Sequence, residues 1–476
     1  MRTAARWTSL LVACLVSTVG SASCGSDDPP GASDGDAGAD AGSGDAGGGG
    51  DAANDLGVAA CNAPAVVASI GACIDAGGAP RNCLGTERAK TPAPDGCDFD
   101  DDGMDDALED AMARSYAPVF AFNLGTGDHT SGDSESAWPG NANFYVQRST
   151  LVWRLDNDNK TLAVVDTKPT LDSLRAATFK DGANTRHASD PKTGEGPNFW
   201  LCLNKPGGSY DPASFVPTVD DSSKLADGVD VFTVVHPSGN DRSGRYAVMT
   251  YMLYFPYNKF SFDDHEGDFE GGAVFVDLEL GNIAAVYTDR HSTADNFKLI
   301  ALEGAGSLPA KDPKNEAPHY NVCDPTDSPA IGGVRFWDFG GNRHHPVLYA
   351  SGGDHASYAY PGATKLQGVG CSEQTMVRDV HNGNNAKLVP HEDAYYTDWG
   401  TTKKAVPSGV HIRNLGERKK LRLEWTAFAG QWGCTYESIP KSFPGPWDNE
   451  RLCRHWLTND WGVAPPFTAS TLTTCK

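Results

Sequence analysis

The chain has 476 residues, 39 Lys and Arg against 62 Asp and Glu, and a formal net charge of −23. An acidic excess of this size argues against a nucleic-acid partner, because binding to phosphates needs a basic surface. It also argues against simple electrostatic adhesion to anionic lipid, so binding to a membrane surface would need a bridging cation or a specific headgroup site.

The first 24 residues have the organisation of an export signal. Arg2 and Arg6 precede an apolar stretch, residues 7–20, that is too short to span a bilayer. Small residues follow and lead to Cys24. This arrangement resembles a bacterial lipoprotein signal, in which Cys24 would be lipidated and become the first residue of the mature chain. The resemblance predicts a signal peptide at residues 1–24 and a cell-envelope protein held at a bacterial membrane by its N-terminal lipid.

An ordinary secretory signal cleaved near Ala22 is the alternative, because Ser21 stands where a lipoprotein signal usually carries Leu. The product would then be secreted without an anchor. Both interpretations place the mature chain outside the cytoplasm. No later stretch of the sequence is apolar and long enough to suggest a transmembrane helix.

Residues 25–60 consist mainly of Gly, Ala, Ser and Asp, with almost no large apolar side chain. Such a composition cannot bury enough surface to offset the entropy lost on ordering. The segment also holds eight Asp and no Lys or Arg, which favours an extended, solvated chain. We therefore expect a disordered tether that spaces a folded domain from a membrane.

Cysteine usage supports an exported protein. Of twelve Cys, Cys14 would be lost with the signal and Cys24 would carry lipid, which leaves ten. An even number in an exported protein suggests up to five disulfides. Four of the ten lie in a Cys-rich segment, residues 61–97, and are close enough to pair among themselves, whereas six are spread over the large domain. A zinc site is disfavoured, because no C-x-x-C or C-x-x-H spacing occurs.

An acidic segment, residues 98–109, fits the calcium-loop template D-x-D-x-D-G-x5-E at every required position. Residues 91–96 contain two prolines and cannot form the entering helix of an EF-hand. Residues 98–115 therefore resemble a solitary extracellular calcium loop and its following helix, as in dockerin or thrombospondin type 3 repeats, with a structural role. An acidic N-cap for a helix at residues 105–115 is the alternative. Gly103 would make the turn, and the ligands would be Asp98, Asp100, Asp102, Asp106, Glu109 and the carbonyl group of Met104.

Residues 116–476 are predicted to be all-β, mainly an antiparallel β-sandwich with long loops. Short segments rich in β-branched and aromatic residues are bounded by Gly, Pro, Asn or Asp, which is typical of strands. Helical periodicity is weak outside residues 105–115 and 171–177. Long loops at 179–229 and 304–330 would absorb the excess length. The predicted strands are residues 143–147, 151–155, 161–166, 230–236, 245–257, 271–278, 282–289, 298–302, 334–339, 346–351 and 421–426.

The central motif, H-E-G-D-F-E at residues 265–270, combines an imidazole and carboxylates between two predicted strands. If Asp268 begins the second strand, Asp268 and Glu270 project from one face, because side chains alternate along a strand. His265 would lie in the preceding turn, where Gly267 permits a bend toward them. The three side chains form a candidate site for Ca²⁺ or Mg²⁺, since hard cations prefer oxygen ligands. The alternative is the polar end of a hairpin with solvated charges.

Other polar residues lie near the ends of predicted strands. His291 ends one strand, and His345, Asp354 and His355 flank another strand and a Gly-Gly turn. Taken singly, each is more typical of core packing or turn chemistry than of a site. Together they are candidate ligand-binding residues, and His291 and His355 are the candidate acid–base residues if the protein is an enzyme.

Six motifs, in this order, resemble those of the vacuolar protein sorting-associated protein sixty-two family. The resemblance covers most of residues 116–447 and implies a fold and the location of a site more than an activity. Phe269 stands where Trp is usual, and Asp354 stands where Ser commonly precedes His-Ala, which adds an acidic group beside the site. The motifs are Y-A-P-V-F (116–120), Y-M-L-Y-F-P-Y-N (251–258), D-H-E-G-D-F-E (264–270), Y-T-D-R-H (287–291), H-P-V-L-Y-A-S-G-G-D-H-A-S-Y (345–358) and F-A-G-Q-W-G (428–433).

The central motif is also similar to the H-x-x-D-x-E motif of the necrosis-inducing toxin family, a group of β-sandwich cytolysins. In that family these residues hold a divalent cation near a surface that binds membrane glycolipid. The similarity implies that His265, Asp268 and Glu270 hold a cation in this chain.

Three functions from different classes remain open. The preferred one is an exported module that uses a cation to bind a glycan or a lipid headgroup. The second is a metal-dependent hydrolase acting on an ester or a phosphate, although no nucleophile elbow, H-E-x-x-H motif or two-metal ligand series occurs. The third is a structural envelope lipoprotein whose cations only lock loops.

Overall fold

The structure is a computed structural model that describes part of the chain. The signal at 1–24 with Cys24, the tether at 25–60, the side chains of Asp100, His291 and Asp354, and the predicted strand at 421–426 lie outside the described residues. The described residues are 61–92, 97–98, 102–123, 139–155, 161–189, 197–204, 227–237, 245–258, 265–288, 298–301, 336–338, 344–350, 355, 357–358, 385–389, 395–398, 403–405, 409–415, 428–434 and 443–444.

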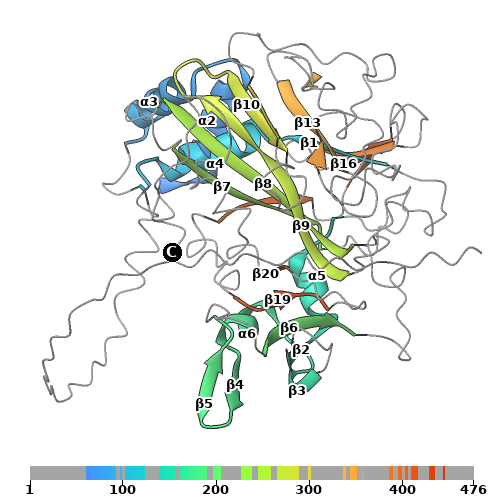
Figure 1. Cartoon of the computed structure of the whole chain (residues 1–476). Helices are drawn as coiled ribbons and strands as arrows, with labels where there is room; N and C mark the ends of the chain where they lie inside the picture. Colours follow the sequence, from blue (N-terminus) through green and yellow to red (C-terminus); the bar gives the residue numbers. More distant parts are fainter. Residues whose placement is uncertain are drawn as a thin grey trace, which may run out of the picture. The chain divides into compact units, whose positions relative to one another are not determined.

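Short helices precede and interrupt a series of strands (Figure 1). The helices are α2 (Pro64–Asp75), α3 (Pro80–Lys90), α4 (Asp106–Ser115), α5 (Ala142–Val146) and α6 (Leu171–Ala176). The strands are β1 (Val119–Asn123), β2 (Ser149–Arg154), β3 (Thr161–Asp166), β4 (Thr178–Asp181), β5 (Asn184–His187), β6 (Asn198–Leu203), β7 (Val229–Pro237), β8 (Tyr246–Asn258), β9 (His265–Asp277), β10 (Ile283–Thr288), β11 (Lys298–Ala301), β12 (Phe336–Asp338), β13 (His344–Ala350), β14 (Ser357–Tyr358), β15 (Asn385–Val389), β16 (Tyr395–Asp398), β17 (Lys403–Ala405), β18 (Val410–Asn414), β19 (Gln431–Trp432) and β20 (Phe443–Pro444).

The described part of the chain is mostly β and forms several sheets. One sheet has the order β12-β13-β1-β15-β16-β17, with β14 paired to β13, and a second has the order β11-β10-β9-β8-β7-β18. A third has the order β20-β19-β6-β2-β3, and β4 and β5 form a hairpin of their own. Strand pairs β1–β13, β7–β18 and β6–β19 are parallel, so the sheets are mixed, and the other described pairs are antiparallel, which confirms the mainly antiparallel pairing that was predicted.

Several predicted elements occur where the pattern placed them. Strand β3 coincides with its predicted range, and β8 differs from its prediction by one residue at each end. Helix α6 begins with a capping box in which the side chains of Thr170 and Ser173 each accept the other's backbone N–H. Helix α4 also occupies the range in which helical periodicity was expected.

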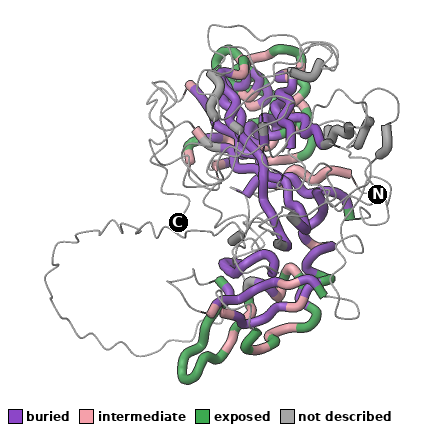
Figure 2. Tube along the Cα trace, turned by 45° about the vertical axis from the view of Figure 1, so that its right-hand side comes forward, coloured by how far each residue is buried: buried purple, intermediate pink, exposed green. Residues whose placement is uncertain are grey.

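The predicted strand at residues 143–147 is wrong, because this segment forms α5. The side chain of Asn141 accepts the backbone N–H of Asn143 at 2.8 Å and starts the helix. The predicted loop at 179–229 is also wrong in part, since it contains β4, β5 and β6. Strand β6 is buried on both faces, and its apolar run lacks the alternation that marks a half-exposed strand. Figure 2 shows that the β4–β5 hairpin is largely exposed.

The Cys-rich segment pairs within itself, as predicted. Disulfides join Cys61 to Cys97 and Cys73 to Cys83, and they hold α2 and α3 together. A third disulfide joins Cys202 to Cys434. Because disulfides persist in oxidising compartments, the three bonds indicate an extracytoplasmic protein. In the described part of the chain, no helix is both long and apolar enough to cross a bilayer.

Helices α2, α3 and α4 share one apolar core with the β7–β10 sheet. Val66 and Ile70 of α2 and Met112 of α4 are buried with Val274 and Val276 of β9. In Figure 1 the three helices lie together beside these strands. The Cys-rich segment is therefore part of the same core as the sheet.

Two buried tyrosines stabilise this packing with hydrogen bonds. The Tyr116 hydroxyl donates to the carbonyl of Gly281 and the Tyr251 hydroxyl to that of Ala113, both at 3.0 Å. Burial raises the pKa of both tyrosines above the ordinary value, so both hydroxyls stay protonated and can donate.

The other face of β7–β9 covers a second, aromatic core. Phe232, Tyr254 and Phe269 are buried there with Tyr145 and Trp432. Because these strands are buried on both faces, β8 and the second half of β9 carry apolar residues at nearly every position. Polar side chains within these strands are therefore exceptions that require specific partners.

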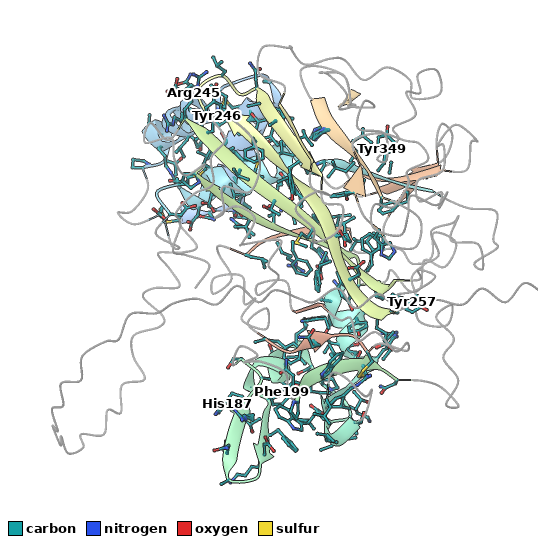
Figure 3. The ribbon with its side chains drawn as sticks, viewed as in Figure 1. His187, Phe199, Arg245, Tyr246, Tyr257 and Tyr349 are labelled. Carbon is teal, nitrogen blue, oxygen red and sulfur yellow. A yellow bond between two sulfur atoms is a disulfide. The ribbon has the colours of Figure 1, made fainter. Side chains whose placement is uncertain are left out.

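Asp277 is the last residue of β9, at the end away from the central motif, and hydrogen bonds hold its carboxylate. One carboxylate oxygen accepts two hydrogen bonds from Arg245, at 2.8 and 2.6 Å. The other accepts the backbone N–H groups of Glu279 and Leu280 at 2.9 and 3.1 Å. Burial acts to raise the pKa of Asp277, but these hydrogen bonds together lower it below the ordinary value. Arg245 and Tyr246 mark this end of β8 in Figure 3.

We expect Asp277→Asn to lower the free energy of unfolding by about 1 to 2 kcal/mol at pH 7, because a charge-assisted hydrogen bond is lost. The folded pKa lies below the unfolded one, so the native stabilisation is present above the unfolded value and is lost as pH falls through the folded value. Urea unfolding at about pH 7 and about pH 3 measures this. Asp181→Asn in the exposed hairpin is the control, and an equal deficit of Asp277→Asn at both pH values would contradict the ion-pair account.

Candidate functional site

The central motif forms the first half of β9 and pairs with the end of β8. Asp268 lies opposite Phe255, and Glu270 lies opposite Leu253. The strand begins at His265, so the turn predicted there is wrong. The backbone of His265 is described, but its side chain lies outside the described residues. Asp268 and Glu270 do project from one face of the strand, as the alternation predicted.

Gly267 distorts β9 between the motif's carboxylates. Its φ is +66°, a left-handed conformation that residues with a Cβ adopt only at a cost. A Cβ at this position would also overlap the carbonyl oxygen of Trp432. Gly433 shows the reverse relation, because its own Cβ would overlap the carbonyl oxygen of Glu266. Two glycines thus let two backbones meet where no side chain fits.

Glu266 makes structural hydrogen bonds at this meeting point. One carboxylate oxygen accepts the backbone N–H of Leu203 at 2.7 Å and that of Cys434 at 3.1 Å. The backbone N–H of Glu266 donates in turn to the carbonyl of Cys434 at 3.1 Å. Tyr257 of β8 lies opposite Glu266 in the strand register, and Figure 3 labels it at this end of β8. Glu266 therefore ties β9 to β6 and β19.

Tyr145 lies beside the same carboxylate and is one of the aromatic residues on this side of β9. Its hydroxyl is 2.9 Å from the carbonyl of Leu201 and 3.5 Å from Glu266. Burial, with smaller contributions from Tyr254 and Glu266, raises the pKa of Tyr145 well above the ordinary value. The hydroxyl thus stays protonated and donates. The ring packs on Trp432, with centroids 6.1 Å apart.

The kink at Gly267 sends neighbouring carboxylates of the motif to opposite sides of the sheet. Glu266 and Phe269 lie on the side of Trp432, in the aromatic core. Asp268 lies on the other side, where it meets His355. Regular alternation would instead have placed Glu266 and Asp268 on one face.

Asp268 and His355 form a buried carboxylate–imidazole pair. Oδ2 of Asp268 is 3.2 Å from Nδ1 of His355, and both side chains are at most 1% exposed. The acceptor on Nδ1 places the ring proton on that nitrogen and so sets the tautomer of the ring. The ring also stacks on Phe255, with centroids 3.8 Å apart and an interplanar angle of 6°. Sequence analysis had proposed both residues without pairing them.

His355 is held in an unfavourable backbone conformation. Its φ is +57°, and among the described residues it is the one non-glycine residue with a positive φ. Such a conformation costs about 1 to 3 kcal/mol and persists only where the surroundings impose it. The stacking on Phe255 and the bond to Asp268 supply that constraint.

Glu270 adds a second buried carboxylate to this side of β9. It follows Asp268 on the same face and is 1% exposed. β9 therefore carries two buried carboxylates on one face, of which Asp268 lies beside the imidazole of His355.

His345, another candidate ligand, has a local role in the structure. It is fully buried on β13, and its Nδ1 is 2.7 Å from the carbonyl oxygen of Ala117. Because a carbonyl only accepts, Nδ1 carries the proton and donates. The bond ties β13 to the residues just before β1.

The described part of the acidic loop is held by hydrogen bonds from its backbone to its own carboxylates. Asp98 accepts the backbone N–H groups of Asp102 and Gly103 at 3.0 and 2.8 Å, and Asp102 accepts that of Met104 at 2.8 Å. Gly103 has a φ of +94°, as a sharp turn requires. Met104 is buried.

The helix that follows the loop supports the alternative as well. Asp105 caps α4 by accepting the N–H of Ala107 at 3.0 Å, and it also pairs with Arg88. Asp106 and Glu109 are fully buried, and Glu109 accepts a hydrogen bond from Asn414 at 2.8 Å. Across the described residues, no group of three or more His, Cys, Asp or Glu side chains is arranged to hold a metal ion. Asp100 and the side chain of His265 are outside that set.

A second carboxylate–imidazole pair was missed by sequence analysis. Asp230 of β7 lies 3.3 Å from Nδ1 of His411 and 3.2 Å from Nε of Arg413, both on β18. Its other oxygen accepts the N–H of Ala142 at 3.1 Å. The alternation in V-H-I-R-N is the one signal that could have marked a strand here. The cluster joins β18 and α5 to the sheet.

Comparisons with protein-family models, with curated proteins and with solved structures found no match to this chain. The two family resemblances therefore stay predictions that rest on the quoted motifs.

We expect Gly267→Ala to lower the free energy of unfolding by more than about 2 kcal/mol, because it combines backbone strain with overlap at Trp432. Gly85→Ala is the matched control, since a Cβ there meets no atom within 4 Å in helix α3. That change should raise stability by about 0.5 to 1 kcal/mol. Thermal and urea unfolding measure both, and a neutral Gly267→Ala would contradict the close contact.

Proposed function

We propose that this exported protein is a cation-dependent binding module, built on a β-sandwich, that engages a glycan or a lipid headgroup. The cation would be held by His265, Asp268 and Glu270, the set that the central motif predicts, and the bond from His355 would hold Asp268 in position. The single observation that carries the proposal is the burial of Asp268, Glu270 and His355 on one side of β9, with Asp268 bonded to His355.

Electrostatics supports a functional role for this group. Removing a carboxylate from water costs several kcal/mol unless its partners compensate, so buried carboxylates are retained where they are used. A divalent cation would compensate two carboxylates at once. Their oxygen atoms suit Ca²⁺ or Mg²⁺. A hydroxyl-rich headgroup can complete the coordination shell of such a cation without any reaction.

The arrangement of His355 fits the same proposal. In metal sites, a hydrogen bond between a carboxylate and Nδ1 of histidine fixes the ring and its tautomer. Asp268 makes this bond at 3.2 Å. His355 would therefore orient Asp268 toward the cation.

The remaining features would place this module at a membrane. A lipid on Cys24 would anchor the chain, and residues 25–60 would carry the domain away from the bilayer. A Ca²⁺ ion in the loop that begins at Asp98 would stiffen the junction. The net charge of −23 favours contact with anionic lipid only through a cation.

We expect the protein to bind one cation at the central site and one at the acidic loop. Isothermal titration with Ca²⁺ and Mg²⁺ should show that Asp268→Ala/Glu270→Ala removes one site and that Asp98→Ala/Asp100→Ala removes the other. Affinities of about 10⁻⁴ to 10⁻³ M are typical of extracellular calcium modules. Asp181→Ala, in the exposed hairpin, is the control and should change neither site.

Loss of metal in the Asp98→Ala/Asp100→Ala variant alone would overturn the central cation site. If both sites bind, liposomes and glycan arrays with and without chelator then test the headgroup. Binding that persists in chelator would contradict a cation bridge.

A hydrolase is the second candidate, and the strained, carboxylate-bound His355 is the observation that favours it. An imidazole fixed through Nδ1 can act as a general base through Nε2. We expect cation binding without turnover when nitrophenyl esters and nitrophenyl phosphates are assayed with Ca²⁺ or Mg²⁺. Turnover that falls at least about a hundredfold in His355→Gln, with the cation still bound, would establish the hydrolase instead.

A further inference from the structure

The Cys202–Cys434 disulfide lies directly beside the buried carboxylate of Glu266. Leu203, which follows Cys202, donates its N–H to Glu266 at 2.7 Å. Cys434 itself donates its N–H to the same oxygen at 3.1 Å and accepts the N–H of Glu266 at 3.1 Å. The disulfide therefore joins the two segments that supply the backbone donors of one buried carboxylate.

The non-covalent pairing between these two segments is short. Strand β19 has two residues, and its register with β6 consists of the pairs Gln431–Trp200 and Trp432–Leu201. The cysteines are separated by 232 residues in the sequence. Closing so long a loop during folding carries an entropic cost, and the covalent bond removes that cost by constraining the unfolded chain.

Glu266 connects the two disulfide-linked segments to the central site. It lies two residues before Asp268, and Gly267 between them is pressed against Trp432 and Gly433. If β19 moves away from β6, a buried carboxylate loses a donor and the backbone loses the contact that imposes its kink. Asp268 would then shift relative to His355.

We propose that the central site takes its functional geometry only when the Cys202–Cys434 disulfide has formed. Glu266 is the positioning residue that links the disulfide to the site. The inference rests on the proposed function and concerns the regulation of that same site. Two thiols lose two protons and two electrons to a disulfide-class oxidant, and the bond that forms fixes both donors on Glu266. In the reducing compartment of synthesis the site is incomplete, and it gains its cation affinity only after export.

The test uses the full chain carrying Asp98→Ala/Asp100→Ala, so that calorimetry with Ca²⁺ reports the central site alone. In this background, Cys202→Ser/Cys434→Ser and Glu266→Gln should each weaken Ca²⁺ affinity about tenfold to a hundredfold, as losses around metal ligands do. Cys73→Ser/Cys83→Ser is the matched control, because it removes a disulfide from α2 and α3. It should change the affinity less than about threefold. Circular dichroism verifies that each variant is folded.

A second measurement distinguishes a failure of this inference from a failure of the proposed function. The ¹⁵N signals of the His355 ring report its bond to Asp268 whether or not a cation binds. They should shift in Cys202→Ser/Cys434→Ser and in Glu266→Gln, and stay unchanged in the control. If the parent binds no Ca²⁺ that depends on Asp268, the proposed function fails, and these signals alone decide the inference. Unshifted signals in the folded variants, unchanged affinity, or an equal effect of the control would overturn it.

Discussion

The contact between the backbones at Gly267 and Trp432 is the constraint on which the central region depends. No side chain fits between these segments, and Gly267 must be left-handed to follow the path. Because of this kink, the side chain of Glu266 lies on the side of the aromatic core and that of Asp268 lies on the opposite side of the sheet. A strand with regular alternation would have placed both carboxylates in one environment, and they could not have taken different roles.

Buried carboxylates recur through the described residues, and several of them make defined hydrogen bonds. Glu266 accepts backbone N–H groups, Asp277 binds Arg245, and Glu109 binds Asn414. These bonds join segments that are far apart in the sequence and compensate the loss of water. Asp268 differs, because its partner His355 is a fully buried imidazole, whereas the imidazole beside Asp230 is partly exposed. This difference is the reason we propose a cation site on its side of β9.

Periodicity and turn residues predicted the elements whose signals are local. Strand β3 and helix α6 are examples, and the pairing of Cys61, Cys73, Cys83 and Cys97 among themselves followed from their proximity. Contacts between distant segments were not predictable in this way. The pairing of Asp268 with His355, 87 residues apart, depends on β13 and β14 returning to β9. The structural role of Glu266 was not predictable, because nothing local indicates that residues 203 and 434 meet there.

The most direct test of this account is a crystal structure of the protein grown with Mn²⁺, with anomalous scattering recorded to locate the metal. Mn²⁺ accepts the oxygen ligands of Ca²⁺ and Mg²⁺ sites and is visible without ambiguity. The account predicts an anomalous peak bound by Asp268 and Glu270, on the side of β9 that holds His355, with Glu266 still bonded to Leu203 and Cys434. A peak at Glu266, or a crystal in which Asp268 and Glu270 bind no metal, would contradict it.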